Sequence, residues 1–405
     1  MVRLRKTANY ILLPLFFIIV TVVALTVNAH YINNVEHFGA KADGKTDSSS
    51  AFLKAWAASC SSMVPSTVYV PRKKYTIGET VFEGPCNNSA ITFQIDGVLI
   101  APDYKQMNFS AQNWLLFDQV DGVSVIGGFL DGRGTSLYAC KASNQQGCPE
   151  GPTTLAFYTS NNILVQNVIS MNAKLFHIVV HSCKNVLLQG IKIRAPDESL
   201  NTDGIHIQNS FNVKVLNAGI KTGDDCISIG PGTQNLWIQR VACGPGHGIS
   251  IGSLAHDLEE EGVQNVTVKT VVFTETQNGL RIKSWGRPSK GFVKGVVFKH
   301  ITMNNVYNPI FIDQNYCPIK EGCPDQHSGI QISQVTFVDI QGTSATQVAM
   351  KFDCSETSPC KDIKLQNIKL TYQQEKQQQL QEPAESFCKN VLGVALGPVL
   401  PPSCL

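Results

Sequence analysis

The chain repeats one phrase three times at intervals of 22 residues: Asp203-Gly204-Ile205-His206-Ile207, Asp225-Cys226-Ile227-Ser228-Ile229 and His247-Gly248-Ile249-Ser250-Ile251. Each phrase is short, β-branched and alternating, which is typical of a strand. Equal spacing in a repeated phrase predicts equivalent positions in successive turns of a coil. The residues that open the phrases, Asp203, Asp225 and His247, are therefore expected to lie in one column.

A second strand-like phrase recurs after an asparagine, at Asn162, Asn185, Asn212, Asn235 and Asn265. Gly, Asn and Asp occupy the gaps between phrases, as they do at turns. Repeats of about 22 to 30 residues with several short strands each indicate an all-β fold, a right-handed parallel β-helix whose stacked coils share one core. A leucine-rich horseshoe would need a Leu-x-x-Leu-x-Leu frame that the sequence lacks, and a propeller would need longer repeats.

The stretch from Asp47 to Cys60 is the best candidate for a helix. Asp47 is expected to cap it, and its apolar face comprises Ala51, Phe52, Leu53, Trp56 and Ala57. We expect this short N-terminal helix to cover the open end of the coil, where unpaired strand edges are a liability. The Gln- and Glu-rich stretch from Gln373 to Ser386 is expected to be a solvated loop.

The N-terminus has the pattern of a secretory leader. Arg3, Arg5 and Lys6 precede an apolar run over residues 10–27, and Val27-Asn28-Ala29 offers a small-x-small cleavage site. We expect residues 1–29 to be a cleaved signal peptide, residues 30–405 to form one β-helix domain, and the mature chain to be secreted and free of the membrane. Because the run is almost long enough to span a bilayer, a retained signal anchor is the competing interpretation.

The charge of the chain is nearly balanced. The formal net charge is +2, and removal of the three leader cations leaves about −1 by the same counting. This balance gives no basic field that would attract a polyanion over a long range, so nucleic acid is not an expected partner. Any recognition of an anion must be local.

Thirteen cysteines in an exported chain predict disulfides. Short separations favour four pairs: Cys226 with Cys243, Cys317 with Cys323, Cys354 with Cys360, and Cys388 with Cys404. Cys60 with Cys86 and Cys140 with Cys148 are also plausible pairs, and the sequence alone does not prove the pairing. Cys183 is then left over and is expected to be buried and free. A zinc site has little support, because no Cys-x-x-Cys pair exists. Sequons at Asn87, Asn108 and Asn265 predict glycosylation.

In the repeated phrases the isoleucines should point inward and the residues between them outward. This register gives one outward row of His206, Ser228, Ser250, Arg281 and Phe311, and a second of Gln208, Gly230, Gly252, Lys283 and Asp313. Adjacent coils are about 4.8 Å apart, so Arg281 and Lys283 are expected about one coil beyond His247, on the face that carries the acids. The two glycines would leave the floor of a groove open.

Three acids and a histidine, Asp203, Asp224, Asp225 and His247, are the candidate catalytic residues. Glycoside hydrolysis needs a proton for the leaving oxygen and a base or nucleophile for the anomeric carbon. Crowded carboxylates supply both, because their repulsion keeps one of them protonated. Asp224, which is offset from the column, is expected to be the acid, and Asp203 with Asp225 to hold a water as bases. Activity is therefore expected to be highest at mildly acidic pH.

Each of these residues also has a purely structural interpretation. Gly-Asp-Asp is most often a turn, His247 between two glycines could cap one, and Arg281 with Lys283 could be a solvated strand face. Their joint placement favours a site, since five mutually compensating polar residues on one face are hard to obtain from unrelated turns. Arg281 and Lys283 would then bind a carboxylate on the sugar.

Four motifs occur in order along the chain: Asn201-Thr202-Asp203, Gly223-Asp224-Asp225, Gly246-His247-Gly248 and Arg281-Ile282-Lys283. They resemble the signature motifs of the polygalacturonases, glycoside hydrolase family 28, and their context resembles the plant members. The likeness covers nearly the whole mature chain, from Phe38 to the last cysteines. Ala255-His256 departs from the usual glycine context of the family.

The resemblance implies inverting hydrolysis of α-1,4-galacturonan, the backbone of pectin in the cell wall, with no metal and no organic cofactor. It implies Asp224 as general acid, Asp203 and Asp225 as general bases, and His247 as a supporting residue. It also supports the Cys226–Cys243 bridge. The residues that it implies for substrate binding are Asn201, Arg281, Lys283 and Tyr316.

The segment from Gln277 to Trp285 looks more like endo-acting plant relatives than like exo-acting ones, and we expect a monomer. Three other functions stay open. An exo-acting polygalacturonase would need a wall at one end of the groove. A pectate lyase on a similar β-helix would need a calcium cage and a basic catalyst. A non-catalytic pectin-binding coil would bind without turnover.

Overall fold

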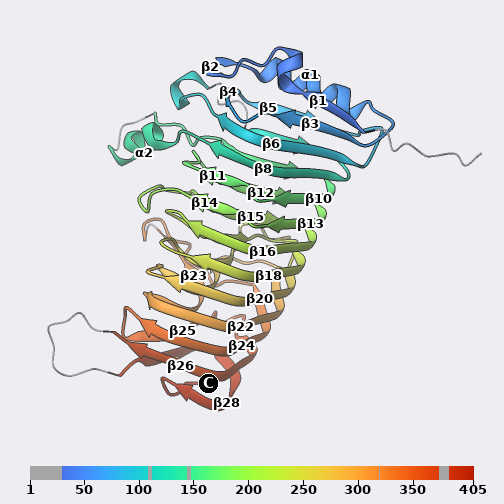
Figure 1. The fold of residues 1–405 in the computed structure, drawn as a ribbon. Helices are drawn as coiled ribbons and strands as arrows, with labels where there is room; N and C mark the ends of the chain where they lie inside the picture. Colours follow the sequence, from blue (N-terminus) through green and yellow to red (C-terminus); the bar gives the residue numbers. More distant parts are fainter. Residues whose placement is uncertain (1–29, 108–111, 144–146, 319, 374–382) are drawn as a thin grey trace, which may run out of the picture.

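The computed structural model describes residues 30–107, 112–143, 147–318, 320–373 and 383–405. This part of the chain forms a parallel β-helix, as the repeats predicted, with successive coils stacked along one axis (Figure 1). The expected signal peptide and the sequon at Asn108 lie outside the described residues. Among the described residues, no helix has the length and apolar character needed to cross a membrane.

Two sheets run along the stack, and the described residues place 17 strands in one and 11 in the other. The first sheet contains β1 (Tyr31–Asn34), β2 (Asp43–Asp47), β3 (Ser66–Val70), β4 (Lys74–Thr76), β6 (Ile91–Ile100), β8 (Val123–Asp131), β10 (Asn161–Gln166), β11 (Ile169–Met171), β13 (Lys184–Gln189), β14 (Lys192–Arg194), β16 (Phe211–Lys221), β18 (Gln234–Cys243), β20 (Val263–Thr274), β22 (Phe292–Val306), β24 (Gln331–Ser344), β26 (Cys360–Tyr372) and β28 (Val391–Leu400).

The second sheet contains β5 (Thr80–Glu83), β7 (Asn113–Asp118), β9 (Thr153–Tyr158), β12 (Ile178–His181), β15 (Ile205–Gln208), β17 (Ile227–Ile229), β19 (Ile249–Leu254), β21 (Asn278–Trp285), β23 (Asn308–Tyr316), β25 (Val348–Asp353) and β27 (Glu385–Lys389). The helices of the described residues are η1 (Val35–Phe38), α1 (Ser49–Cys60), η2 (Tyr104–Gln106) and α2 (Thr135–Ala142).

The register of the second sheet confirms the inward and outward rows. Ile205, Ile227 and Ile249 pair side by side and are all buried. His206, Ser228, Ser250 and Arg281 then follow one another on the outward side, as expected. The register shifts after Ile251, so Gly252 lies beside Lys283 without being its ladder partner.

The recurring asparagines form a ladder at the turns before the first sheet. Asn162, Asn185, Asn212, Asn235 and Asn265 all have φ between 54° and 58°, a left-handed conformation that asparagine tolerates better than most residues. The Asn212 Nδ2 donates to Asn185 Oδ1 at 2.8 Å, and the Asn185 Nδ2 donates to Asn162 Oδ1 at 3.0 Å. Each repeat thus uses its asparagine for a turn and for a bond to the next coil.

Helix α1 covers the N-terminal end of the stack, as expected, but its details differ from the prediction (Figure 1). The helix begins at Ser49 and its N-cap residue is Ser48, one position later than predicted. The Asp47 side chain accepts a hydrogen bond from the N–H of Ser49, the first helical residue, and another from the N–H of Gly78 outside the helix. Leu53 and Ala57 face solvent rather than the core. The buried stripe of the helix is narrower than the predicted apolar face, because only the side with Ala51, Phe52 and Trp56 packs against the first coil.

The polar stretch over residues 373–386 was expected to be a loop, and most of it lies outside the described residues. Its last two residues, Glu385 and Ser386, belong to strand β27 instead. They pair with Val348 and Met350 of β25, which extends the second sheet by one coil. Sheet pairing at the end of the stack thus outweighs the polar composition there.

The cysteine predictions are confirmed. All six pairs form disulfides, including Cys226–Cys243, Cys354–Cys360 and Cys388–Cys404, and Cys183 is free and buried. Of the two sequons that the structure describes, Asn87 lies next to the Cys60–Cys86 bridge and Asn265 lies in the exposed asparagine ladder.

Candidate active site

The turns that enter the second sheet bring the predicted acids together. Strands β15, β17, β19 and β21 lie side by side, and Asp203, Asp225 and His247 stand at the equivalent position two residues before the first three of them. Asp224 precedes Asp225 in the same turn and lines the groove. The column predicted from the 22-residue spacing therefore exists.

Asp225 is the anchor of a buried charge network. Its Oδ1 accepts hydrogen bonds from Ser250 Oγ at 2.7 Å and from an Arg281 Nη at 3.0 Å, and its Oδ2 accepts one from Lys283 Nζ at 2.8 Å. Burial on its own would raise the pKa of Asp225, but the Lys283 and Arg281 cations outweigh burial and lower it to about 2. Asp225 is therefore a carboxylate at any pH near neutrality.

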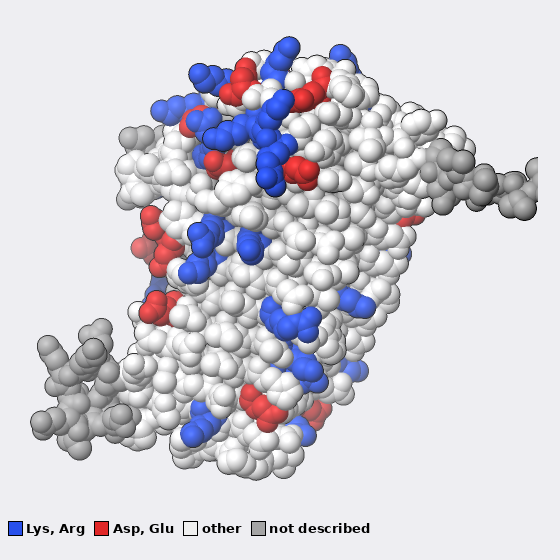
Figure 2. Space-filling view, viewed as in Figure 1, with Lys and Arg blue, Asp and Glu red and all other residues white. Residues whose placement is uncertain are grey.

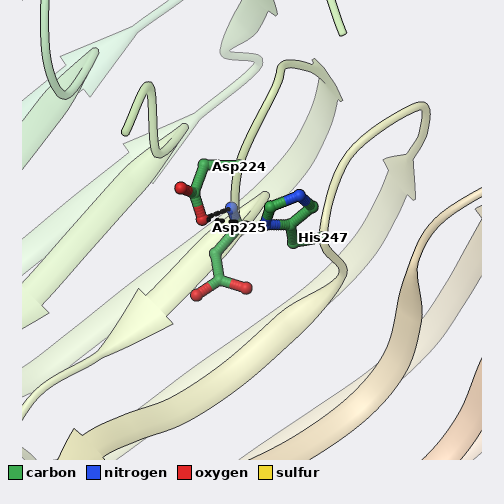
Figure 3. Close-up of side chains that lie close together, drawn as sticks. All are labelled: Asp224, Asp225 and His247. Atoms are coloured by element: carbon green, nitrogen blue, oxygen red, sulfur yellow. Dashed lines mark hydrogen bonds and ion pairs between the residues drawn. The ribbon is translucent and has the colours of Figure 1, made fainter. Parts of the chain in front are cut away.

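Asp224 is more accessible than its neighbour. Its Oδ1 accepts the Asp225 backbone N–H at 2.7 Å and lies 3.1 Å from Nδ1 of His247 (Figure 3). These two contacts fix one carboxylate oxygen and leave the other to reach a ligand in the groove. His247 itself contacts the site through Asp224, since its side chain does not line the cavity.

The environment of Asp203 differs from those of Asp224 and Asp225. Its residue surface is 7% exposed, and it has no salt bridge to a cation in the described structure. Burial, and then the neighbouring charges of Asp224 and Asp225, raise the pKa of Asp203 well above its ordinary value. The three carboxyl groups thus have three different environments.

The cluster also contains side chains of the kinds that bind divalent cations. Donor atoms of Asp224, Asp225 and His247 lie within 4.8 Å of one another. Both Asp225 oxygens, however, already bind cationic side chains at 3.0 and 2.8 Å. A metal would be placed beside two positive charges, so the residues present do not fit a metal centre.

The acids open into a cavity of about 950 Å³. Asp203, Asp224, Asp225, Lys283 and Tyr316 line it, as does the exposed Asn201. The Lys283 ammonium lies 5.1 Å from the centroid of the Tyr316 ring, within cation–π range. Gly230 and Gly252 also line the cavity, so the expected open floor is present. Arg281 is not a lining residue and acts on the cavity from beneath, through its ion pair with Asp225.

Several lining residues were not among the predicted site residues. His206 stacks on Phe176 with ring centroids 5.2 Å apart, and burial lowers the pKa of His206. Glu150, His256 and Glu260 come from connections between strands. His206 was detectable from its outward row, whereas the connections vary from coil to coil and carry no repeat signal.

Charged side chains are scattered over the face of the molecule that Figure 2 shows. In Figure 2 the charged side chains on the visible face are of both signs and are separated by uncharged surface. Most of the Lys and Arg side chains on this face gather near the N-terminal end, close to acidic ones.

The chain is thus a parallel β-helix with clustered carboxyl groups in an open groove, an arrangement suited to glycoside hydrolysis of a polysaccharide. The chain belongs to the glycosyl hydrolases family 28, whose model matches residues 60–391. It is 57% identical over 372 residues to a polygalacturonase of Prunus persica, across 92% of this chain and 93% of that protein.

Two further comparisons bear on the mode of action and on the fold. The chain is 42% identical to an exopolygalacturonase of Platanus acerifolia, across 91% of this chain and 96% of that protein. Endo-xylogalacturonan hydrolase from Aspergillus tubingensis shares the fold, with a TM-score of 0.73 at 19% identity, across 91% of this chain and all of that one. Relatives in the family thus carry names of both endo and exo enzymes.

Proposed function

We propose that this chain is an endo-acting polygalacturonase that hydrolyses α-1,4-galacturonosyl bonds in the polygalacturonan of pectin. The observation that carries the proposal is the buried Asp225–Arg281–Lys283 network beside two further carboxyl groups. It supplies acids for glycoside hydrolysis and cations for an acidic sugar in one groove. Family membership and the polygalacturonase relative support the same chemistry.

Asp224 is the general acid in this proposal. Its fixed Oδ1 orients the carboxyl group, and its second oxygen is free to protonate the leaving glycosidic oxygen. His247 is a positioning residue that holds the acid through the 3.1 Å contact. The departing sugar then leaves as a neutral alcohol.

Asp203 and Asp225 activate the attacking water, with unequal shares. The raised pKa of Asp203 makes it the stronger base when it is ionised, whereas the lowered pKa of Asp225 makes it a weak one. Asp225 instead keeps a fixed negative charge near the anomeric carbon, where the transition state develops positive charge. The reaction needs neither a metal nor an organic cofactor.

The substrate carboxylate binds at Lys283, with Tyr316 and Asn201 beside it. Arg281 and Lys283 carry two positive charges against the single negative charge of Asp225, so one positive charge is left for a galacturonate carboxylate. The Tyr316 ring offers an apolar face for the sugar, as aromatic side chains do. A neutral sugar would leave this charge unpaired, which favours uronates.

Hollows on both sides of the acids favour endo action. A hollow of about 270 Å³ shares Phe176 and His206 with the main cavity on the side of β9 and β12. A hollow of about 550 Å³ shares His256 with it beyond the end of β21. A polysaccharide chain can therefore continue past the acids in both directions, as internal cleavage requires.

We also propose that residues 1–29 are a cleaved leader, that residues 30–405 are the mature catalytic domain, and that it acts in the cell wall as a monomer. The basic and apolar leader pattern and the six disulfides support export to an oxidising compartment. The cell-wall substrate of the proposed reaction fits the same location.

Chromatography of the first products from polygalacturonate tests the proposal. We expect a mixture of oligomers of several lengths at early times. Monomer alone would mean exo action, products that absorb as unsaturated sugars would mean a lyase, and binding without products would mean a non-catalytic coil. Each of these three results contradicts the proposed function.

A further inference from the structure

The groove does not stop at Tyr316. Strand β21 ends at Trp285, and Arg287 follows two residues later, beside the hollow of about 550 Å³. His256 lines both this hollow and the main cavity. The two are therefore neighbouring parts of one surface, and the residues between them are in place to contact a polymer that extends beyond the acids.

Arg287 is a cation held in place without a carboxylate partner. Its guanidinium lies 5.3 Å from the centroid of the Trp285 ring. Its backbone N–H donates to the Trp285 carbonyl at 2.8 Å, and its own carbonyl accepts the Gly329 N–H at 2.9 Å. Among the salt bridges of the described residues none involves Arg287, although Asp325 lines the same hollow.

This sets Arg287 apart from the other cations near the groove. Arg281 and Lys283 share Asp225, and Lys290 is paired with Glu259. A solvated arginine that merely packs on a tryptophan is the ordinary alternative. The difference here is that its hollow adjoins a groove proposed to bind a polymer with one carboxylate on every sugar.

Aromatic rings connect Arg287 with the site of the acids. Tyr316 and Trp285 meet edge to face with centroids 5.2 Å apart, and the Trp285 and His256 rings are 6.0 Å apart. The Trp285 Nε1 donates to His256 Nε2 at 3.3 Å. The rings thus form a continuous strip from Lys283, which lies over Tyr316, to Arg287. Apolar sugar faces pack on such strips.

We propose that Arg287, Trp285 and His256 form a further carbohydrate subsite that binds a second hexuronate residue of the polymer. The guanidinium binds the carboxylate of this residue by charge-assisted hydrogen bonds, and the rings of Trp285 and His256 contact its ring face. The inference rests on the proposed function, because it takes the polymer in the groove to be a polyuronate.

The test compares Arg287→Gln with Lys290→Gln on galacturonate oligomers of increasing length. Both variants remove one exposed cation from the same turn region, but the Lys290 charge is already paired with Glu259. For Arg287→Gln we expect KM to rise about tenfold for oligomers long enough to reach the subsite, the size of one lost charge-assisted hydrogen bond. kcat and the shortest cleaved oligomer should be unaffected, and Lys290→Gln should match wild type.

Two further measurements separate this inference from the proposed function. Methyl-esterified oligomers lack the carboxylate, so the difference between Arg287→Gln and wild type should vanish with them. Titration of each protein with hexagalacturonate measures binding whether or not the wild type hydrolyses it, and Arg287→Gln should bind about tenfold more weakly.

Equal binding by wild type and Arg287→Gln, or a KM effect of the same size at every length, would overturn the subsite. Failure of the wild type to cleave polygalacturonate would instead overturn the proposed function, and the titration would still decide whether Arg287 contacts a polyuronate.

Discussion

The coils at the N-terminal end and the coils of the groove share one strand register. They differ in the residues that point outward, which are apolar in the first and polar or charged in the second. One inward ladder runs through Phe82, Phe117 and Phe157 to Ile207 and Ile229, and it is apolar throughout. The adjacent outward row changes along the same strands. It begins as Val81, Leu116, Ala156 and Val179 and continues as His206, Ser228, Ser250 and Arg281.

The inward and outward positions of these strands therefore have separate roles. The N-terminal rings pack closely, with centroids 4.8 Å apart for Phe82–Phe117 and 5.2 Å for Phe117–Phe157. The groove coils keep the aliphatic core and place buried charges on the other side of the strand. Because successive strand residues alternate in direction, charge chemistry can be added to the stack without opening its core.

The largest expected effect is on catalysis, from Asp224→Asn. The amide keeps the shape of the side chain but cannot protonate the leaving oxygen, so kcat should fall about a thousandfold. The melting temperature should stay close to that of wild type, since Asp224 is partly exposed and forms no buried ion pair with a cation of the network. Kinetics and thermal melting measure the two quantities. A variant with substantial activity would remove Asp224 from its proposed role.

The matching change in the N-terminal coils is Phe117→Ala. Loss of a fully buried ring between Phe82 and Phe157 should lower the free energy of unfolding by about 4 kcal/mol. Turnover per folded molecule should be unchanged, because no part of Phe117 lines the groove. Denaturant titration and active-site titration check this. A large loss of kcat in the folded fraction would show that the two regions are not independent.

Asp225→Asn should lower both kcat and the free energy of unfolding, because it leaves Arg281 and Lys283 buried without their anion. The free energy of unfolding should fall by about 3 kcal/mol at neutral pH. The pKa of Asp225 is lowered, so its stabilisation is present above the ordinary value of about 4 and is lost as pH falls towards the folded value of about 2. Melting curves of wild type and variant should therefore converge at acidic pH. A difference that does not depend on pH would contradict the charge network.

An effect on stability of opposite sign is expected from Asp203→Asn. Because the pKa of Asp203 is raised, ionisation of this buried group costs stability once pH rises above its ordinary value of about 4. The variant should be more stable than wild type at neutral pH and equal to it at pH below about 4. Its activity should be lost, because the base that activates the water is gone. Melting temperatures across this range give the answer, and a destabilised variant at neutral pH would show that the carboxylate is compensated.

The sequence was sufficient for the fold and for most of the acid cluster because both depend on period. The 22-residue repeat places Asp203 and Asp225 in one column, and the next strand-like phrase, at Gly279–Lys283, extends the outward rows to Arg281 and Lys283. Period cannot show which side chains bind one another. The binding of both cations to Asp225 is set by side-chain reach across two coils and emerged only in the structure.

The groove walls were not predictable in the same way. His256 and Glu260 lie in the connection after β19, where the backbone N–H groups of Ala255 and His256 are directed at the Glu260 carboxylate. This connection lies outside the repeated phrases, so the period of the sequence did not point to it. The predicted apolar face of helix α1 was partly wrong for a similar reason. Composition places Leu53 and Ala57 on that face, but tertiary contact decides which residues are covered.

The stereochemistry of the first product shows whether Asp225 acts as a fixed charge or as a nucleophile. Carboxyl pairs are about 5–5.5 Å apart in retaining glycosidases and about 6.5–9.5 Å apart in inverting ones. One oxygen of Asp224 and one of Asp225 lie within 4.8 Å of each other, so Asp225 is close enough to the acid to be considered as a nucleophile. Both Asp225 oxygens, however, are bound by Arg281, Ser250 and Lys283, which leaves the carboxylate unable to form a covalent bond to the sugar without losing them.

Proton NMR of the reducing end, recorded within the first minutes of hydrolysis of an α-linked galacturonate oligomer, distinguishes the two outcomes. The account predicts that the β-anomer forms first and then mutarotates, because water activated by Asp203 attacks from the opposite face. Initial formation of the α-anomer would mean a covalent intermediate on Asp225 and would contradict the assignment of that residue as a fixed charge.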